Sequence, residues 1–403
     1  MTISFDLPQD ILKLCGEIRE WGVEEVRPLA READRIKALP AAANDVMARC
    51  PVNLSPLAIA TFGRTRSDWG DDFRLTGHAS NYVLGAAVSE ALGYGDSWPV
   101  AVLRGSIGEK AILALGTPGQ QEYWVGGFMR GEFRSSAFAL TEPHFGSDVS
   151  QVNTTAVRRG DAWVVNGAKM YCSLGASADY TVLFATIGKS LGRHGIRAFV
   201  VPRGTPGYVV TKAREDKLGL RAFETSALSF DDMELPADSL LGGEDQDSRG
   251  FYGALATLNT SRPITAAWAV GIASGCLDYL RRWVRQHGRA FSVERRQRIE
   301  EDVRRMQAGL TQARLLNLRA AWLQDCGRPN RREASAAKAF APQVAEAVCR
   351  RAAAIMGPDG VSERHLVEKW NRDIRVFDIW EGSGQIQRLT ISRSLLGSGA
   401  GRG

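Results

Sequence analysis

The change of residue periodicity along the chain constrains the fold more than any other feature. Residues 8–30, "PQDILKLCGEIREWGVEEVRPLA", place apolar side chains at three- and four-residue steps, which is the period of an amphipathic helix. From about residue 134 to residue 243, short β-rich runs follow one another between Gly-Asp, Asn-Gly and Pro-Gly turn signals. Beyond residue 243, long Ala-, Leu- and Arg-rich segments return to the helical period. The pattern predicts helices, then a β segment, then helices again.

This pattern predicts an α+β fold in three parts, and 403 residues suffice for two or three cores. We expect an N-terminal helical domain over residues 1–133. Residues 134–243 should form a middle β-barrel or sandwich domain, with a hairpin turning at Gly160 and Asp161. Residues 244–403 should form a C-terminal helical domain, an antiparallel four-helix bundle.

Charge and cysteine usage exclude several functional classes. The 51 basic and 45 acidic residues are spread along the chain without a basic run, so we expect no nucleic-acid partner. The six cysteines lie far apart without metal-ligand spacing, which predicts reduced thiols, no metal site and a cytoplasmic location. The N-terminus lacks the basic and apolar segments of a signal peptide. No apolar run reaches the length of about eighteen residues that a membrane span needs.

General motifs for nucleotide binding and hydrolysis are missing. The chain has no G-x-G-x-x-G after a strand, no Walker A loop, no H-E-x-x-H and no G-x-S-x-G. The segment Phe138–Ser150, "FALTEPHFGSDVS", instead leaves a β run and passes through Gly146, Ser147 and Asp148. Glycine lets backbone N–H groups approach a ligand, and the hydroxyls add donors. Taken alone, this segment is either a ligand-binding loop or an ordinary polar loop.

Several segments resemble the acyl-CoA dehydrogenase family, in family order and at family spacing from about Leu84 to Leu396. "ALTEPHFGSD" is similar to the family signature TEP-x-x-GSD, and "VVNGAKMYCSLG" is similar to its NG-x-K strand pair. "DKLGLRAFETSALSFDDMELP", "LNTSRPITAAWAVG" and "RDIRVFDIWEGSGQIQ" are similar to three later family segments. The family's helical, β and helical domains agree with the layout predicted here.

The resemblance implies an FAD-dependent oxidoreductase that acts on an acyl thioester. Glu381 matches the carboxylate that removes the α-proton, while the β-hydrogen leaves as hydride to flavin N5 and a trans-2-enoyl thioester forms. An α C–H is a weak acid, so its base must be positioned and shielded from water. Arg262 matches an arginine that supports this glutamate and binds the thioester. The substrate is expected to contact Ser147, Asn259, Arg262 and Glu381.

The resemblance also implies which residues hold FAD. Residues expected around the flavin and its ribityl or phosphate groups are Phe138, Leu140, Thr141, Gly146, Ser147, Tyr171, Ser173, Ser383 and Gln385. Tyr171 is open to a second reading as a core side chain, and Asn259 as a helix-surface amide. Asn259 also stands where most members have Asp. The resemblance further implies an acyl-CoA or acyl-carrier thioester as substrate and an electron-transfer flavoprotein as electron acceptor.

The chain departs from the family where a neighbouring subunit contributes to FAD binding. Gln297 matches a family glutamine there and is expected to contact FAD. Aligning the two puts Gln286 in place of the family Arg and Arg289 in place of Phe. Later, Ala354 stands at a family Gln and Pro358 at a family Gly, and proline has no N–H to offer a phosphate. Two explanations stay open. Either a homodimer or homotetramer uses Arg285 or Arg289 instead, or a paralogous subunit completes the site in a heteromer.

Two other functional classes stay open as well. This fold also hosts flavin oxidases and monooxygenases, which typically lack the glutamate at position 381 or replace it. The chain could alternatively be a non-catalytic subunit that stabilises an active paralog. Retention of Glu381 argues against both classes, whereas the altered FAD contacts favour the second.

Overall fold

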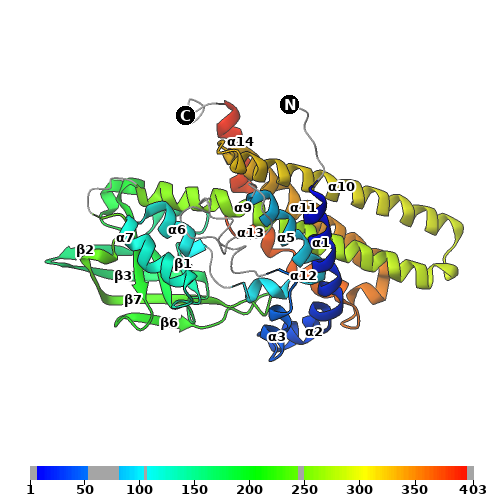
Figure 1. The fold of residues 1–403 in the computed structure, drawn as a ribbon, viewed down its shortest axis with the longest axis horizontal. Helices are drawn as coiled ribbons and strands as arrows, with labels where there is room; N and C mark the ends of the chain where they lie inside the picture. Colours follow the sequence, from blue (N-terminus) through cyan, green and yellow to red (C-terminus); the bar gives the residue numbers. More distant parts are fainter. Residues whose placement is uncertain (1–6, 53–80, 104–106, 244–248, 397–403) are drawn as a thin grey trace. The chain divides into compact units, whose positions relative to one another are not determined.

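The computed structural model describes residues 7–52, 81–103, 107–243 and 249–396 (Figure 1). Contacts group the chain into two compact units. The helical unit comprises Met1–Leu103, Lys217–Ala222 and Asn259–Gly403, and the sheet unit comprises Arg104–Asp216 and Phe223–Leu258. Helices at both ends of the chain and a sheet between them confirm the predicted α+β class. The units follow contacts rather than chain order, so the three-domain division stays a prediction.

The helical unit combines three long helices, α9, α10 and α11, with several shorter ones. Its α-helices are α1 (Gln9–Trp21), α2 (Arg27–Ile36), α3 (Ala43–Ala48), α5 (Asn81–Gly95), most of α9 (Arg249–His287), α10 (Val293–Asp325), α11 (Arg331–Met356), α12 (Leu366–Asp373), α13 (Val376–Ile379) and α14 (Gly384–Leu396). Short π or 3₁₀ turns are η1 (Gly22–Val26), η4 (Trp98–Ala101), η9 (Gly288–Ala290) and η10 (Gly357–Val361). Helices α10 and α11 pack along each other (Figure 1). No helix in the described part of the chain is both long and apolar enough to cross a membrane.

Glycine and alanine allow the helices of this unit to approach closely. Ala266, Ala269 and Ala273 on α9 are fully buried. A Cβ on Gly271 would lie 2.1 Å from the carbonyl oxygen of Glu90 on α5, so no larger residue fits there. Close packing of this kind lets small side chains form a dense core.

Among its described residues, the sheet unit contains short helices and seven strands. Its helices are α6 (Ile107–Leu115), α7 (Pro118–Gln121), η5 (Glu122–Gly126), α8 (Gly127–Met129), η6 (Val149–Gln151), η7 (Lys189–Gly195) and η8 (Ala237–Ser239). Its strands are β1 (Ser136–Ala139), β2 (Thr155–Arg159), β3 (Ala162–Ser173), β4 (Tyr180–Thr186), β5 (Ile196–Pro202), β6 (Tyr208–Lys212) and β7 (Thr225–Pro236). The predicted hairpin is confirmed, since Arg159 pairs with Ala162 across the Gly160–Asp161 turn.

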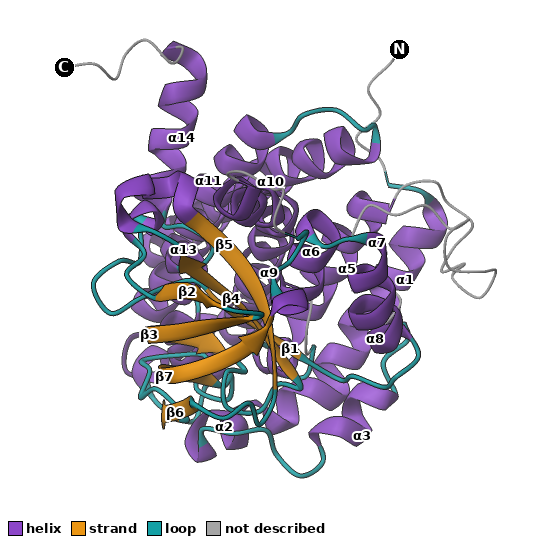
Figure 2. Ribbon diagram, turned by 90° about the vertical axis from the view of Figure 1, so that its left-hand side faces the viewer, coloured by secondary structure: helices purple, strands orange, loops and turns teal. Residues whose placement is uncertain are grey.

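The strands form a single curled sheet, which Figure 2 shows in orange. Its order is β1-β4-β2-β3-β7-β6, with β5 paired to β4. Every residue of β4 is buried, as expected for a strand covered on both faces. Strand β1 pairs in parallel with β4 and ends at Ala139, so the chain leaves the sheet just before the loop singled out in the sequence.

Candidate active site

The loop that follows β1 is anchored by the carboxylate of Glu142. This carboxylate accepts hydrogen bonds from the backbone N–H groups of Asn153 (2.7 Å) and Thr154 (2.8 Å) and from Lys169 Nζ (2.8 Å). Lys169 Nζ also donates to the carbonyl oxygen of Leu140 at 3.0 Å. Burial opposes the charge of Glu142, but Lys169 and the two N–H donors keep its pKa below the usual value. The buried pair therefore ties the loop to β3.

Three hydroxyl groups around this loop are free to bind a ligand. Within the described residues, the side chains of Thr141, Ser147 and Ser173 make no hydrogen bond to the protein. Thr141 and Ser173 are half-buried, and Ser147 is exposed. A Cβ on Gly146 would meet only a methyl group of Thr141, at 3.8 Å, so the loop backbone is open there. Such donors suit a planar group with carbonyl oxygens and ring nitrogens, as in a flavin ring.

Strand β3 bends where it passes this loop. Met170 N–H donates to the carbonyl oxygen of Thr141 at 2.9 Å. The next residue, Tyr171, adopts a φ of 57° and leaves its side chain 59% exposed. A positive φ at a non-glycine residue is strained and is often found at functional sites. Tyr171 is therefore not a core side chain. The ring of Phe138 instead packs on Phe184, at 4.9 Å between centroids, and Leu140 is buried.

In the helical unit, Glu381 occupies the turn between α13 and α14. It adopts a φ of 56°, and Gly382 follows with a φ of 93°. Two successive residues with positive φ interrupt the helical path between α13 and α14. Ser261 Oγ on α9 donates to Glu381 Oε2 at 2.7 Å. The turn presents a half-buried, hydrogen-bonded carboxylate, as a general base requires.

Helix α9 supplies the predicted partners of this glutamate. Arg262, which is buried, donates from Nε to the carbonyl oxygen of Glu381 at 3.3 Å. It also donates from Nη1 to Asn259 Oδ1 at 2.6 Å. Burial lowers the pKa of Arg262 to about 10, and the Glu381 carboxylate opposes this shift. Arg262 therefore remains a cation at neutral pH. The structure brings Asn259, Arg262 and Glu381 together, and Asn259 is more than a surface amide.

Sequence reasoning missed several residues that hold these positions. Lys338 on α11 and Gln387 on α14 are fully buried beside the Glu381 turn, and Ser261 bonds the carboxylate itself. The sequence does hold one signal for Lys338. It falls on the apolar stripe of its helix with Ala334, Ala341 and Ala345, where a lysine is rarely buried without a partner.

The remaining predicted residues lie at the helical unit's surface or near it. Ser383 is half-buried and its carbonyl oxygen accepts the N–H of Gln387 at 3.0 Å, while Gln385 is exposed. Gln297 is exposed in the first turn of α10. Among the described residues, no hydrogen bond links Gln297 to the Glu381 turn. Its role in cofactor binding stays a prediction.

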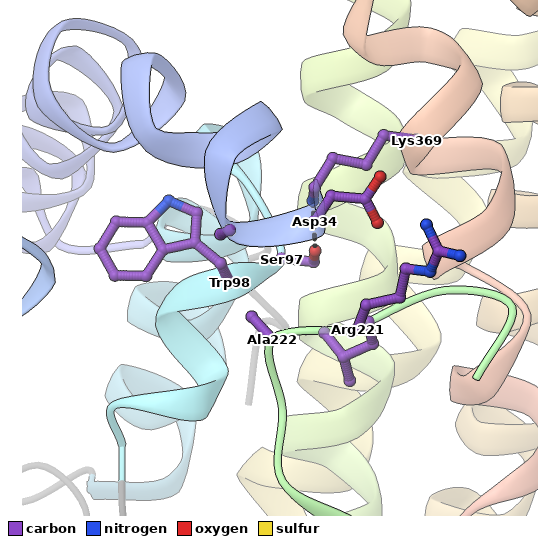
Figure 3. Close-up of a pocket in the computed structure, with 8 residues that line it drawn as sticks. Asp34, Ser97, Trp98, Arg221, Ala222 and Lys369 are labelled. Carbon is purple, nitrogen blue, oxygen red and sulfur yellow. Dashed lines mark hydrogen bonds between the residues drawn. The ribbon is translucent and has the colours of Figure 1, made fainter. Parts of the chain in front are cut away.

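A shallow recess also lies in the helical unit, apart from the predicted residues. Figure 3 shows Lys369 and Ser97 at its edge, together with Asp34, Trp98 and Arg221. Lys369 is buried, and its ammonium contacts Asp96 at 2.7 Å and Asp373 at 2.6 Å. Ser97 and Trp370 also donate to these two carboxylates, so the cluster makes its hydrogen bonds within the protein. In the described part of the chain, no group of three or more His, Cys, Asp or Glu residues is placed to hold a metal ion.

Comparison with known proteins bears on both units. Residues 137–233 match the acyl-CoA dehydrogenase middle domain, and residues 248–396 match the acyl-CoA dehydrogenase C-terminal domain. The mitochondrial short-chain specific acyl-CoA dehydrogenase of Bos taurus is 34% identical over 98% of this chain and 92% of its own length. An acyl-CoA dehydrogenase of Bacillus subtilis is 39% identical over 72% of this chain and 76% of its own length. Butyryl-CoA dehydrogenase of Megasphaera elsdenii has a similar structure, with a TM-score of 0.85, 28% identity and coverage of 98% of this chain and 100% of its own.

Proposed function

Because the chain belongs to the acyl-CoA dehydrogenase family, we propose that Glu381 removes the α-proton of an acyl thioester in an FAD-dependent α,β-dehydrogenation. The observation that carries this proposal is the Glu381 turn. Its carboxylate accepts from Ser261 at 2.7 Å, and its backbone is bonded to Arg262. A base held in this way loses little freedom when the substrate binds.

In this proposal, one residue accepts the proton and others position the base and bind the thioester. Glu381 would take the α-proton onto its carboxylate, leaving the α-carbon to form the double bond of a trans-2-enoyl thioester. Arg262 and Asn259 would keep the glutamate turn in place and, with Ser147, contact the thioester. FAD, when bound, would supply the acceptor for the β-hydrogen and its electron pair.

The loop after β1 supports the FAD assignment. Thr141, Ser147 and Ser173 offer hydroxyls that make no hydrogen bond within the described protein, and Tyr171 presents an exposed ring beside them in the chain. We propose that these residues, with Phe138, Leu140, Gly146, Ser383 and Gln385, hold the flavin. Gln297 would contact FAD bound to a neighbouring subunit.

Substrate and partners follow as proposals from the family. An acyl-CoA is the first candidate for the substrate, because the bovine relative is named a short-chain specific acyl-CoA dehydrogenase. A carrier-bound thioester is the second candidate. An electron-transfer flavoprotein is the proposed electron acceptor. The cytoplasmic location stays a prediction from the sequence, and the bovine relative is named mitochondrial.

Substitution of the proposed base tests this function. Butyryl-CoA, added without oxygen to the purified flavoprotein, should bleach the oxidised flavin of the wild type. Glu381→Gln should bind butyryl-CoA and bleach at least about 100-fold more slowly, because a positioned base contributes about 10²–10⁴-fold. Glu363→Gln, at an exposed site on the same unit, should bleach at the wild-type rate. Bleaching of Glu381→Gln at the wild-type rate would show that another group is the base.

A further inference from the structure

Lys338 is a buried lysine with no role in the function proposed so far. It lies on α11 with 0% exposure, and its Nζ donates to the carbonyl oxygen of Gly382 at 3.3 Å. An ammonium ion is costly to bury unless hydrogen bonds or opposite charges compensate for the lost water. Gly382 directly follows Glu381, so the compensation for Lys338 comes from the turn that carries the proposed base.

Side chains from three helices hold the two carbonyl groups of this turn. Arg262 of α9 donates to the carbonyl oxygen of Glu381 at 3.3 Å. Gln387 of α14 donates from Nε2 to the carbonyl oxygens of Glu381 (3.3 Å) and Gly382 (3.0 Å). Lys338 of α11 is the cationic donor to Gly382. Residues with positive φ persist only where their surroundings compensate for the strain, and these donors provide that compensation.

The charged groups that act on Lys338 belong to three elements. They are the carboxylates of Glu381 in the turn and Asp378 on α13, and the guanidinium of Arg262 on α9. Asp378 Oδ1 is buried and has no hydrogen-bond partner among the described residues, and its carboxylate attracts the Lys338 ammonium electrostatically. An electrically balanced cluster is formed only when Lys338 is protonated.

We propose that Lys338 is a positioning residue for Glu381, and that its ammonium group, by holding the Gly382 carbonyl, fixes the direction of the base carboxylate. The inference rests on the proposed role of Glu381 as base. It adds that the geometry of the turn depends on a titratable group outside the turn. A misplacement of about 1 Å costs about 100-fold in rate, so a small movement of this backbone would be visible in kcat.

The proposal predicts an alkaline limb in the pH profile. Burial lowers the pKa of Lys338 to about 8, with Arg262 adding to the shift and Glu381 and Asp378 opposing it. Below this pKa the ammonium is present and the turn is held. Above it, a neutral amine donates a weaker hydrogen bond and Asp378 loses its counter-charge. Activity should therefore fall as pH rises through about 8.

Two substitutions at this position separate the ammonium charge from the side-chain volume. Lys338→Met removes the charge at similar length, and Lys338→Arg keeps a cation that does not titrate below pH about 12. The measurements are kcat and KM for butyryl-CoA from pH 6 to about 10, and the Kd of crotonyl-CoA from the flavin spectrum. Lys13→Met, on the exposed face of α1, serves as the surface control, with a side chain 80% exposed.

In Lys338→Met, kcat should fall by at least about tenfold at neutral pH, the limb near pH 8 should disappear, and the Kd of crotonyl-CoA should stay within about threefold. Lys338→Arg should recover most of kcat and show no limb near pH 8. Lys13→Met should keep the wild-type profile. If Lys338→Met does not fold, the profile of Lys338→Arg decides alone.

A limb near pH 8 that survives in Lys338→Arg would overturn the proposal, as would a wild-type profile without such a limb or a Lys338→Met variant with wild-type kcat. These outcomes are distinct from failure of the proposed function, which only Glu381→Gln reports. If butyryl-CoA does not bleach the flavin of the wild type, amide hydrogen exchange of residues 381–387 replaces kcat as the measurement. Relative to Lys338→Arg at the same pH, exchange in the wild type should rise as pH passes about 8, and equal exchange in the two proteins would overturn the proposal.

Discussion

Glu142 and Lys169 have a structural role that the sequence motif of this loop does not indicate. Glu142 belongs to the TEP signature, yet its carboxylate contacts the protein itself, through Asn153, Thr154 and Lys169. Lys169 is fully buried. The pair keeps Thr141 beside β3, where the hydroxyl is free for a ligand. These two residues act on the proposed flavin site through the backbone that they hold.

Glu142→Gln should destabilise the protein strongly, because it leaves the Lys169 ammonium buried without a counter-charge. Breaking a buried pair in this way costs about 3–5 kcal/mol, which urea unfolding of the variant would measure. Glu132→Gln is the matched control, because Glu132 pairs with Arg130 at 2.7 Å on the surface and should leave the unfolding midpoint unchanged.

The same experiment carries a pH dependence. The pKa of Glu142 is lowered in the folded protein, so its stabilising effect is complete above the unfolded pKa, about 4.3, and is lost as pH falls through the folded value. The difference between wild type and Glu142→Gln should therefore shrink below pH about 4. A difference that is small at pH 7, or constant down to pH 3, would contradict this account of the loop.

At the scale of elements, α9 connects the packing of the helical unit to the site. In its first half, Ser261 and Arg262 bond to Glu381, and Asn259 bonds to Arg262. Pro263 follows directly and has no N–H to donate to the carbonyl of Asn259, which removes one helix hydrogen bond at the site. About two turns beyond Pro263, Gly271 packs against the backbone of α5. The position of α5 therefore limits how far α9 can move.

Gly271→Ala tests this packing. The added Cβ would lie 2.1 Å from the carbonyl oxygen of Glu90, so α5 and α9 must separate, and we expect a loss of about 1–3 kcal/mol in the free energy of unfolding. Gly16→Ala on α1 is the control, because nothing lies within 4 Å of its added Cβ. It should gain about 0.5–1 kcal/mol from helix propensity. Equal effects of the two substitutions on the thermal midpoint would show that α9 packs less closely than described.

At the scale of the whole molecule, the likeness to the bovine relative extends over 98% of the chain, whereas the motifs for the far end of FAD are altered. Ala354 and Pro358, which replace the family Gln and Gly, are exposed. Arg285 and Arg289, which precede Gln297 in the sequence, are exposed and carry charge that suits a diphosphate. We therefore place a homo-oligomer slightly ahead of a heteromer with a paralog.

Purification of this chain alone distinguishes the two assemblies. A homo-oligomer that completes its own site should retain about one FAD per chain, measured from the flavin absorbance together with the mass of the particle in solution. Arg289→Gln, in η9, should then lower FAD retention. Arg319→Gln, on α10, is the control and should not lower it. An apo-protein that gains FAD only when a paralogous subunit is added would favour the heteromer.

The sequence alone determined the order of helices, strands and helices, the hairpin at Gly160 and the identity of the proposed base. These features depend on local periodicity, turn chemistry and short motifs, which neighbouring residues encode. Only the tertiary structure decided which distant side chains hold Glu381. Ser261, Lys338 and Gln387 come from three helices, and their burial and hydrogen bonds arise only when those helices pack. The sequence does not distinguish a buried lysine from a surface lysine. The pKa of Lys338 differs from that of a surface lysine because the folded core removes water from its ammonium group.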